Sequence, residues 1–198
     1  MAFWNESAVE PKRKFKFILI FGASATKLPI FVVKKVNKPE ITISVTPHKF
    51  LGHTYKFPGS TSWNEVTVTL IDPAGSGDSG GGERLDANTV DVSSGLYRIL
   101  EAAGYQNPVE QGSALAGAEG GDIRTFAKST ASKPFDQIKI VQLNASGDAV
   151  ETWTLNNAWL NKVAFGDLDY SSDDISEVTL TFAYDWADLD TRVTSPAP

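Results

Sequence analysis

The chain has 198 residues, 41% of them hydrophobic and 21% charged, and can therefore form one ordinary globular domain with a sizeable core. It has no cysteine and only two histidines, which excludes disulfides and thiolate metal sites and leaves little for histidine-based catalysis. No apolar run approaches the ~20 residues needed to span a bilayer, and the N-terminus lacks the pattern of a secretory signal, so we expect folding in a cytoplasm.

The net charge of −6 is distributed unevenly along the chain. Residues 1–60 hold ten Lys or Arg against three Glu, whereas residues 61–198 hold eight Lys or Arg against 21 acidic residues. Such a division indicates self-complementary surfaces that meet between subunits, one acidic surface beside a basic one, or simply a solvated surface with uneven charge.

The N-terminal part is predicted to be rich in β-strands. Its first strand, at 15–21 (FKFILIF), begins with alternating apolar and polar residues and then becomes apolar on both faces. A strand of this kind is covered on both sides, within a sandwich or by a neighbouring subunit. Further strands are expected at 29–36, 40–46 and 63–71, with a short edge-like piece at 53–57 that Pro58 and Gly59 close.

One helix is predicted in the middle of the chain, between two long loops. Apolar residues recur at helical spacing over 88–104, and Gly104 stands where a C-terminal glycine is expected. The loop at 72–87 is rich in glycine, and the segment 106–133 is long, polar and rich in Gly, Ala and Ser. A connection as long as this second one is typically functional or flexible inside a compact domain.

The C-terminal part returns to strands. Residues 135–143 and 150–157 form a predicted hairpin around the turn at 144–148. The closing strand at 175–186 alternates large apolar residues with small or polar ones, which is typical of a half-buried antiparallel strand. Its apolar face is expected to consist of Val178, Leu180, Phe182, Tyr184 and Trp186.

Together these elements predict a mainly β fold, an antiparallel β-sandwich or half-barrel with about seven to nine strands, one α-helix and long loops. We expect a single domain over 11–189, preceded by an N-terminal extension at 1–10 and followed by a flexible tail at 190–198. The sequence contains no internal repeat.

Two short motifs are better explained as turns than as functional sites. The string GDSGG at 77–81 matches the surroundings of the nucleophilic serine in trypsin-like proteases, but that fold needs far more chain between its histidine and its serine. A flexible turn of small residues is therefore favoured. The acidic stretch 167–174 has oxygen donors at alternate positions but lacks the glycine and glutamate of an EF-hand loop, which favours a solvated acidic turn. No catalytic residue, metal site or cofactor is predicted.

Two further features are only weak indications of binding. In the basic stretch 11–16, lysine alternates with phenylalanine as on one solvated face of a strand, and the patch is short for a nucleic-acid footprint on an acidic protein. The five tryptophans could line a sugar-binding surface, but in alternating strands they are more often core or interface anchors.

Four stretches, taken in order, resemble the tail tube proteins of contractile-tailed bacteriophages. They are the strand after Pro11 (PKRKFKFILI), the stretch 63–72 (WNEVTVTLID), the helix at 88–104, and the closing part with WLN at 159–161, GDLD at 166–169 and EVTLTFAYDW at 177–186. The last of these, a strand that ends in aromatic–Asp–aromatic, is the most specific. Tube initiators of the baseplate and the tubes of type VI secretion systems share the same fold.

The resemblance implies a structural, non-enzymatic virion protein. Its subunits would form hexameric rings that stack into a hollow tube inside a contractile sheath, through which DNA passes into the host without specific binding. The implied partners are further copies of the chain and the sheath, baseplate and tape measure proteins, with no membrane. The protein would be assembled in the host cytoplasm and reside in the virion tail. The physical logic agrees, because lateral sheet extension removes open edges and head-to-tail contacts build a filament.

The first and closing strands supply the candidate assembly residues. Candidate core or intersubunit positions are Phe15, Phe17, Ile18, Ile20, Val178, Leu180 and Phe182. Of these, Ile18 and Ile20 are expected to face a neighbour or the helix, and the others to form the core with Leu19, Val66, Val68 and Leu70. The candidate channel or interface face consists of Thr179, Thr181 and Asp185. The helix is expected across one open end, with 106–133 reaching an adjacent subunit or ring.

Three other functions stay open on the sequence. The first is a baseplate or tube-initiator protein of the same fold, which would bind other partners instead of polymerising. The second is a carbohydrate-binding sandwich that uses surface tryptophans. The third is a hydrolase, for which Ser79 in the GDSGG string is the only indication.

Overall fold

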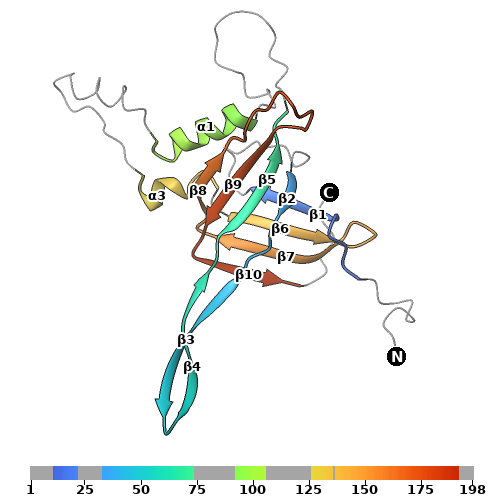
Figure 1. The fold of residues 1–198 in the computed structure, drawn as a ribbon. Helices are drawn as coiled ribbons and strands as arrows, with labels where there is room; N and C mark the ends of the chain where they lie inside the picture. Colours follow the sequence, from blue (N-terminus) through green and yellow to red (C-terminus); the bar gives the residue numbers. More distant parts are fainter. Residues whose placement is uncertain (1–10, 22–32, 74–91, 106–125, 136, 192–198) are drawn as a thin grey trace, which may run out of the picture.

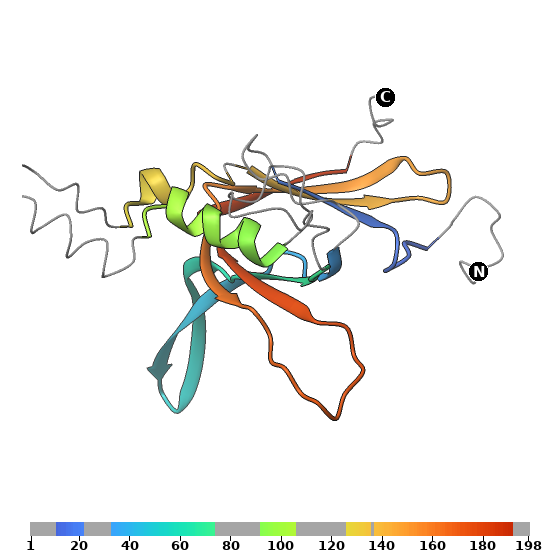
Figure 2. The same cartoon turned by 90° about the horizontal axis from the view of Figure 1, so that it is seen from above.

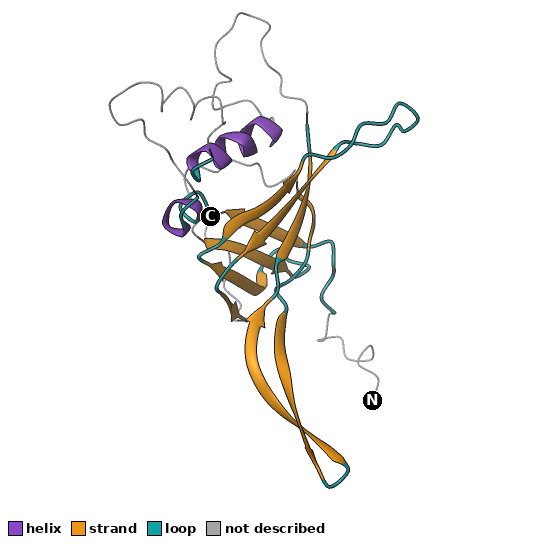
Figure 3. Ribbon diagram, turned by 60° about the vertical axis from the view of Figure 1, so that its left-hand side comes forward, coloured by secondary structure: helices purple, strands orange, loops and turns teal. Residues whose placement is uncertain are grey.

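The protein is a sandwich of two β-sheets from which a long hairpin projects (Figures 1 and 3). The computed structural model describes residues 11–21, 33–73, 92–105, 126–135 and 137–191. Within these residues it has ten strands and two helices, and every strand pair is antiparallel. The predicted mainly β sandwich is confirmed, although its sheets stay open and do not close into a barrel.

The first sheet has the strand order β1-β6-β7-β10. Its strands are β1 (Phe17–Phe21), β6 (Gln137–Leu143), β7 (Ala149–Asn156) and β10 (Trp186–Asp190). The predicted hairpin between β6 and β7 is confirmed by their register and by the turn, where the Asn144 N–H donates to the Asp148 carbonyl at 2.9 Å. Gly147 lies in this turn with a φ of 92°, a conformation that favours glycine.

The second sheet has the order β2-β5-β9-β8. Its strands are β2 (Val33–Val36), β5 (Val66–Ile71), β9 (Glu177–Ala183) and β8 (Trp159–Ala164). In β5 and β9 buried and half-buried residues alternate strictly, as the sequence pattern predicts. The register pairs Val68 with Leu180 across the two strands, so their buried residues face the same side.

The core fills the space between the two sheets and extends under α1 (Val92–Ala102). Phe135 and Phe182 meet edge to face at its centre, with ring centroids 4.9 Å apart, and both are fully buried. Each such side chain contributes about 1.5–3 kcal/mol of transfer free energy. Other fully buried members are Leu19, Val66, Val68, Leu70, Leu96, Ile138, Leu155, Val178 and Leu180.

Helix α1 covers the end of the sandwich opposite the projecting hairpin (Figures 1 and 2). It ends as predicted at Gly104, whose φ is 112°. The Tyr105 N–H donates to the Leu100 carbonyl (2.9 Å) and the Gly104 N–H to the Glu101 carbonyl (3.1 Å), which is the Schellman arrangement. The predicted first residues, 88–91, lie outside the described residues. No helix in the described part of the chain is long and apolar enough to cross a membrane.

A second, short helix corrects the prediction of one continuous loop over 106–133. This helix, α3, spans Lys128–Ala131, and Ala131 is buried against the body of the protein. A single helical turn is too short to produce a recognisable hydrophobic period, so the sequence pattern misses it. The predicted loop residues 74–87 and 106–125, including the GDSGG string, lie outside the described residues.

The predicted closing strand is in fact two strands in different sheets. β9 ends at Ala183 in the second sheet, and Trp186 begins β10, which pairs with β7 in the first sheet. The Asp185 N–H donates to the Asn156 carbonyl at 3.1 Å and so turns the chain across the sandwich. The expectation that Trp186 continues the apolar face of β9 was therefore wrong, and Trp186 is 45% exposed.

Candidate assembly surface

The projecting hairpin is the most exposed ordered element of the structure. It consists of β3 (Ile41–Phe50) and β4 (His53–Trp63), and every residue except Trp63 is exposed. A ten-residue strand is about 33 Å long, so the hairpin reaches far beyond the sandwich (Figures 1 and 3). A two-stranded hairpin by itself is at best marginally stable in water, so a surface that covered it would stabilise it.

The local sequence explains why the chain forms a hairpin here. Leu51 and Gly52 occupy the turn with φ values of 45° and 78°, which is the positive-φ pair of a type I′ turn. A register shift lies between Ile43 and Val45, and a Cβ added at Gly59 would lie 2.4 Å from the Ser44 Oγ. β4 therefore continues through Pro58 and Gly59, where the sequence predicted its end, because an edge strand tolerates proline and the irregular register needs a glycine.

The hairpin surface is apolar and basic. Residues 41–63 contain Lys49 and Lys56 but no acidic residue. Seven large apolar side chains on the hairpin are each at least half exposed, namely Ile41, Ile43, Val45, Phe50, Leu51, Tyr55 and Phe57. Contiguous exposed apolar surface of this kind marks interaction sites in soluble proteins.

The base of the hairpin is fixed firmly to the sandwich. Trp63 packs against Tyr184 with ring centroids 6.1 Å apart, and Trp63 belongs to the edge of the core. The Asn64 N–H donates to the Glu40 carbonyl at 2.9 Å, and the Asn64 Nδ2 donates to the Thr42 hydroxyl at 3.0 Å. The hairpin is thus an arm with a rigid base rather than a loose loop.

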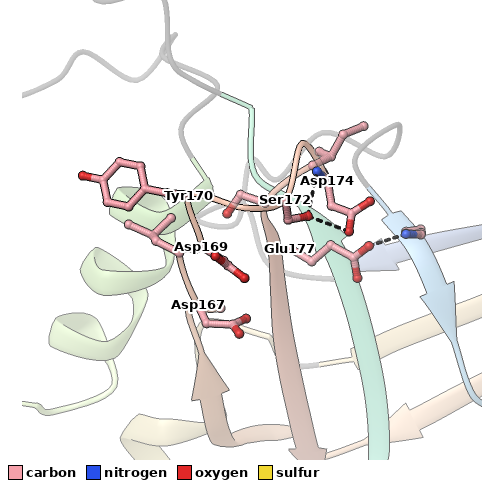
Figure 4. Close-up of a pocket in the computed structure, with 11 residues that line it drawn as sticks. Asp167, Asp169, Tyr170, Ser172, Asp174 and Glu177 are labelled. Carbon is pink, nitrogen blue, oxygen red and sulfur yellow. Dashed lines mark hydrogen bonds and ion pairs between the residues drawn. The ribbon is translucent and has the colours of Figure 1, made fainter.

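A second exposed surface is the acidic loop, residues 165–176, which joins β8 to β9. It carries Asp167, Asp169, Asp173 and Asp174 and no basic residue, and all of its residues are exposed. Its apolar side chains are exposed as well, namely Leu168, Tyr170 and Ile175. The loop curves around an open hollow of about 1240 Å³, and Tyr170 points away from the other labelled side chains (Figure 4).

Hydrogen bonds between neighbouring residues give this acidic loop a defined shape. The Ser171 N–H and hydroxyl donate to the Asp169 Oδ1 at 2.9 and 2.8 Å, and these bonds lower the pKa of Asp169. At the neck of the loop Gly166 has a φ of 82°, and a Cβ there would lie 2.6 Å from the Glu177 carbonyl oxygen. Glu177 also forms an ion pair with Lys34 of β2. In the part of the chain that the structure describes, no three His, Cys, Asp or Glu residues are placed to hold a metal ion.

The candidate residues in β9 lie on two different faces. Val178, Leu180 and Phe182 are fully buried in the subunit's own core. Thr179 and Thr181 are half-buried on the opposite face, opposite Thr69 and Thr67 of β5 respectively. The outer face of the second sheet is therefore a ladder of paired threonines.

Asp185 does not share this threonine face. Its carboxylate accepts hydrogen bonds from the Lys128 Nζ at 2.6 and 2.7 Å and from the Asn157 Nδ2 at 2.8 Å. These bonds lower the pKa of Asp185. Asp185 thus connects α3 to the turn between β9 and β10 within the subunit.

The candidate assembly residues in and before β1 are divided between the core and the surface of the subunit. Leu19 is buried and Phe17 half-buried, whereas Ile18 is half-buried and Ile20 is 41% exposed on the opposite side of β1. Phe15 is 75% exposed, so its predicted place in the core was wrong. The reason is that β1 pairs with β6 only from Phe17 onward, leaving Phe15 before the first paired residue.

A buried polar cluster around Glu151 of β7 was missed by the sequence analysis. Glu151 is 7% exposed and accepts hydrogen bonds from the Lys38 Nζ and the Trp153 Nε1, each at 2.6 Å, and from Lys12. Lys38 also donates to the Gln142 Oε1 at 2.7 Å. The cluster connects the N-terminal segment and the chain after β2 to the first sheet, and each of its polar groups has a partner.

The fold resembles that of solved chains from contractile injection systems, although no protein-family model and no curated protein matches the sequence. The anti-feeding prophage cap, described as a tube-terminating cap, matches with a TM-score of 0.58 and 16% identity over 97% of this chain and 100% of that chain. The sheath/tube terminator of an extracellular contractile injection system (PVC, extended state) matches with a TM-score of 0.58 and 17% identity, over 93% and 99%.

A chain of the sheath–tube complex of the same PVC system also matches, with a TM-score of 0.56 and 15% identity over 97% of this chain and 99% of that chain. These chains come from a tube-terminating cap, a sheath/tube terminator and a sheath–tube complex. The tube-like fold that the sequence resemblance implied is thereby confirmed.

Proposed function

We propose that this protein is a structural, tube-related subunit of a contractile injection machine and that it assembles with copies of itself. One observation carries the proposal most directly. The hairpin β3–β4 is an ordered arm with an uncovered apolar surface, on a fold that matches tube and terminator chains over almost its whole length. Such an arm is marginally stable by itself, and a surface that covers it would stabilise it.

In its finer form the proposal is a phage-type tail tube. Subunits form hexameric rings, the rings stack into a hollow tube inside a contractile sheath, and DNA passes through without specific binding. Among the described residues, β1 and β10 are the outer strands of one sheet and β2 and β8 those of the other, so each has one edge without a partner strand. Pairing of such edges between neighbours within a ring would satisfy their backbone groups. Sheath, baseplate and tape measure proteins are the expected partners, in a virion assembled in the host cytoplasm.

A second candidate function is a terminator or initiator at one end of the tube. It is favoured by the matches to a tube-terminating cap and to a chain of the anti-feeding prophage baseplate, the latter with a TM-score of 0.57 and 16% identity. A protein of this kind forms one ring and binds the end of a tube made by a different subunit. The same fold and the same projecting hairpin are compatible with both functions.

Electron microscopy of the purified protein distinguishes these possibilities. A tube subunit gives uniform hollow tubes whose length increases with concentration, because stacking is a head-to-tail contact without a natural end. An end protein gives single rings at every concentration. A protein that stays monomeric at millimolar concentration would contradict both functions.

A further inference from the structure

We propose that the hairpin tip of one copy docks on the acidic loop of the next copy, so that this contact stacks the subunits. The hairpin tip is defined as residues 49–56, and the acidic loop is 165–176 as above. This inference rests on the proposed function and specifies the partner surface of the hairpin. The occupant is a second copy of this chain.

The charges of the two surfaces are complementary. Lys49 and Lys56 are the charged residues of the hairpin, which has no acidic residue, and the acidic loop has four aspartates and no basic residue. The hydrogen bonds from Ser171 lower the pKa of Asp169 and so favour its ionised form. Opposite charge on two exposed surfaces orients an encounter and opposes wrong pairings.

The apolar residues of the two surfaces also correspond. Leu51 is 83% exposed at the end of the hairpin, in a turn where Asn or Gly would fit the positive φ without strain. A leucine at this position is unfavourable for the isolated hairpin, which points to a contact made by its side chain. The acidic loop offers the matching apolar groups in Leu168, Tyr170 and Ile175.

The positions of the two surfaces suit a head-to-tail contact. The hairpin and the acidic loop lie at opposite ends of the molecule (Figures 1 and 3). Viewed along the long axis, both project on the same side of the sandwich (Figure 2). A second copy displaced along this axis therefore brings its hairpin tip toward the acidic loop of the first copy. The open hollow enclosed by the loop is lined by Asp167, Asp169, Asp174 and Ser172 and provides a concave surface for the tip (Figure 4).

Charge reversal tests this pairing. The first variant carries Lys49→Glu and Lys56→Glu, and the second carries Asp167→Lys and Asp173→Lys. These two aspartates are chosen because the hydrogen bonds that shape the loop involve Asp169 and Asp174 instead. A third variant combines all four changes. A control carries Lys133→Glu and Lys139→Glu, which reverse the same number of exposed lysines elsewhere.

The lysine reversal places two glutamates opposite four aspartates and should raise the protein concentration needed for tube formation by about tenfold or more. The aspartate reversal leaves the loop without net charge and should raise this concentration by a smaller factor, because the attraction is lost without a general repulsion. The four-residue variant should assemble better than the lysine reversal alone, because its glutamates then meet two lysines, and the control should assemble like the wild type. Circular dichroism checks that every variant folds. In the wild type, added salt should also weaken assembly, because the charges are exposed.

The pairing is overturned if the reversals leave assembly unchanged, if the combined variant assembles no better than the lysine reversal alone, or if the control is equally impaired. Those results would leave the tube function intact as long as the wild type forms tubes. A wild type that forms neither tubes nor rings would instead contradict the proposed function, and the pairing with it.

Discussion

Glu151 is a buried carboxylate of β7 that is surrounded by hydrogen-bond donors. Burial alone raises its pKa, but hydrogen bonds from Lys12, Lys38 and Trp153 and the positive charge of Lys38 lower it from 4.5 to about 2. The ionised form is therefore favoured in the folded protein. Because both lysines are about half exposed, the cluster stabilises less than a fully buried network would.

The first prediction concerns stability in acid. A carboxylate with a lowered pKa stabilises the fold at pH values above 4.5, and this contribution is lost as the pH falls toward 2. We expect up to about 3 kcal/mol of the free energy of unfolding to disappear over this range. Urea denaturation at pH 7, 4 and 2.5 measures it. Glu151→Gln should cost about 2 kcal/mol at pH 7 and flatten the pH dependence; an unchanged slope in this variant would contradict the assignment.

Core residues on strands were the most predictable single residues. Val66, Val68 and Val178 occupy the alternate positions that the period-two pattern assigned to the core, because each strand has one face on the core and one outside. Phe15 was misplaced because the pattern does not reveal where pairing begins. The Glu151 cluster was out of reach, since its partners Lys12 and Lys38 are distant in sequence and meet only in the folded chain.

At the level of elements, the hairpin β3–β4 was the least predictable. Period-two alternation reports burial on one face, and an arm that is exposed on both faces has no such burial to report. Pro58 and Gly59 also predicted the end of a strand, although they belong to the irregular part of the hairpin. The sequence feature that does indicate the hairpin is the pair Leu51–Gly52, which lies between two strand-like runs and fits a two-residue turn.

The turn leads to a prediction for the hairpin itself. Leu51→Asn places a residue that tolerates positive φ at the tip, and should stabilise the isolated hairpin by up to about 1 kcal/mol. Amide hydrogen exchange in β3 and β4 should slow accordingly. The same change should weaken assembly, because the apolar contact of Leu51 is lost.

Ser62→Asn, at the exposed base of the hairpin, serves as the control and should affect neither measurement. Wild-type assembly by the Leu51→Asn protein would show that Leu51 makes no contact between copies. A loss of assembly accompanied by faster hydrogen exchange would instead mean that the substitution damages the hairpin.

At the level of the whole molecule, the basic and acidic parts of the sequence contribute to two separate surfaces of the fold. Lys49 and Lys56 of the basic N-terminal part lie on the hairpin, and the aspartates of the acidic loop belong to the acidic remainder. The two surfaces lie at opposite ends of the sandwich (Figure 1). The sequence left open whether the charge division reflects self-complementary surfaces, because pattern alone does not give the distance between two segments.

The fold class was predictable because strands in both sheets alternate apolar and polar residues, and this alternation is visible in the sequence of each strand by itself. The crossing from β9 to β10 was not, because Tyr184 and Trp186 continue the alternation across a turn that tertiary hydrogen bonds impose. The geometry of assembly is even harder to predict from the sequence. It depends on surfaces that only a second copy covers, and such surfaces have no periodic pattern within one chain.

The central claim is that the hairpin is the arm through which this subunit assembles. Ile43 and Thr61 are register partners, so residues 44–60 can be replaced by Asn-Gly to give a short two-residue turn on an unchanged base. Sedimentation velocity of wild type and shortened protein, at equal concentrations, is the most direct measurement. We expect large assemblies from the wild type and a folded species no larger than one ring from the shortened protein. Equal assembly by both proteins would contradict the claim.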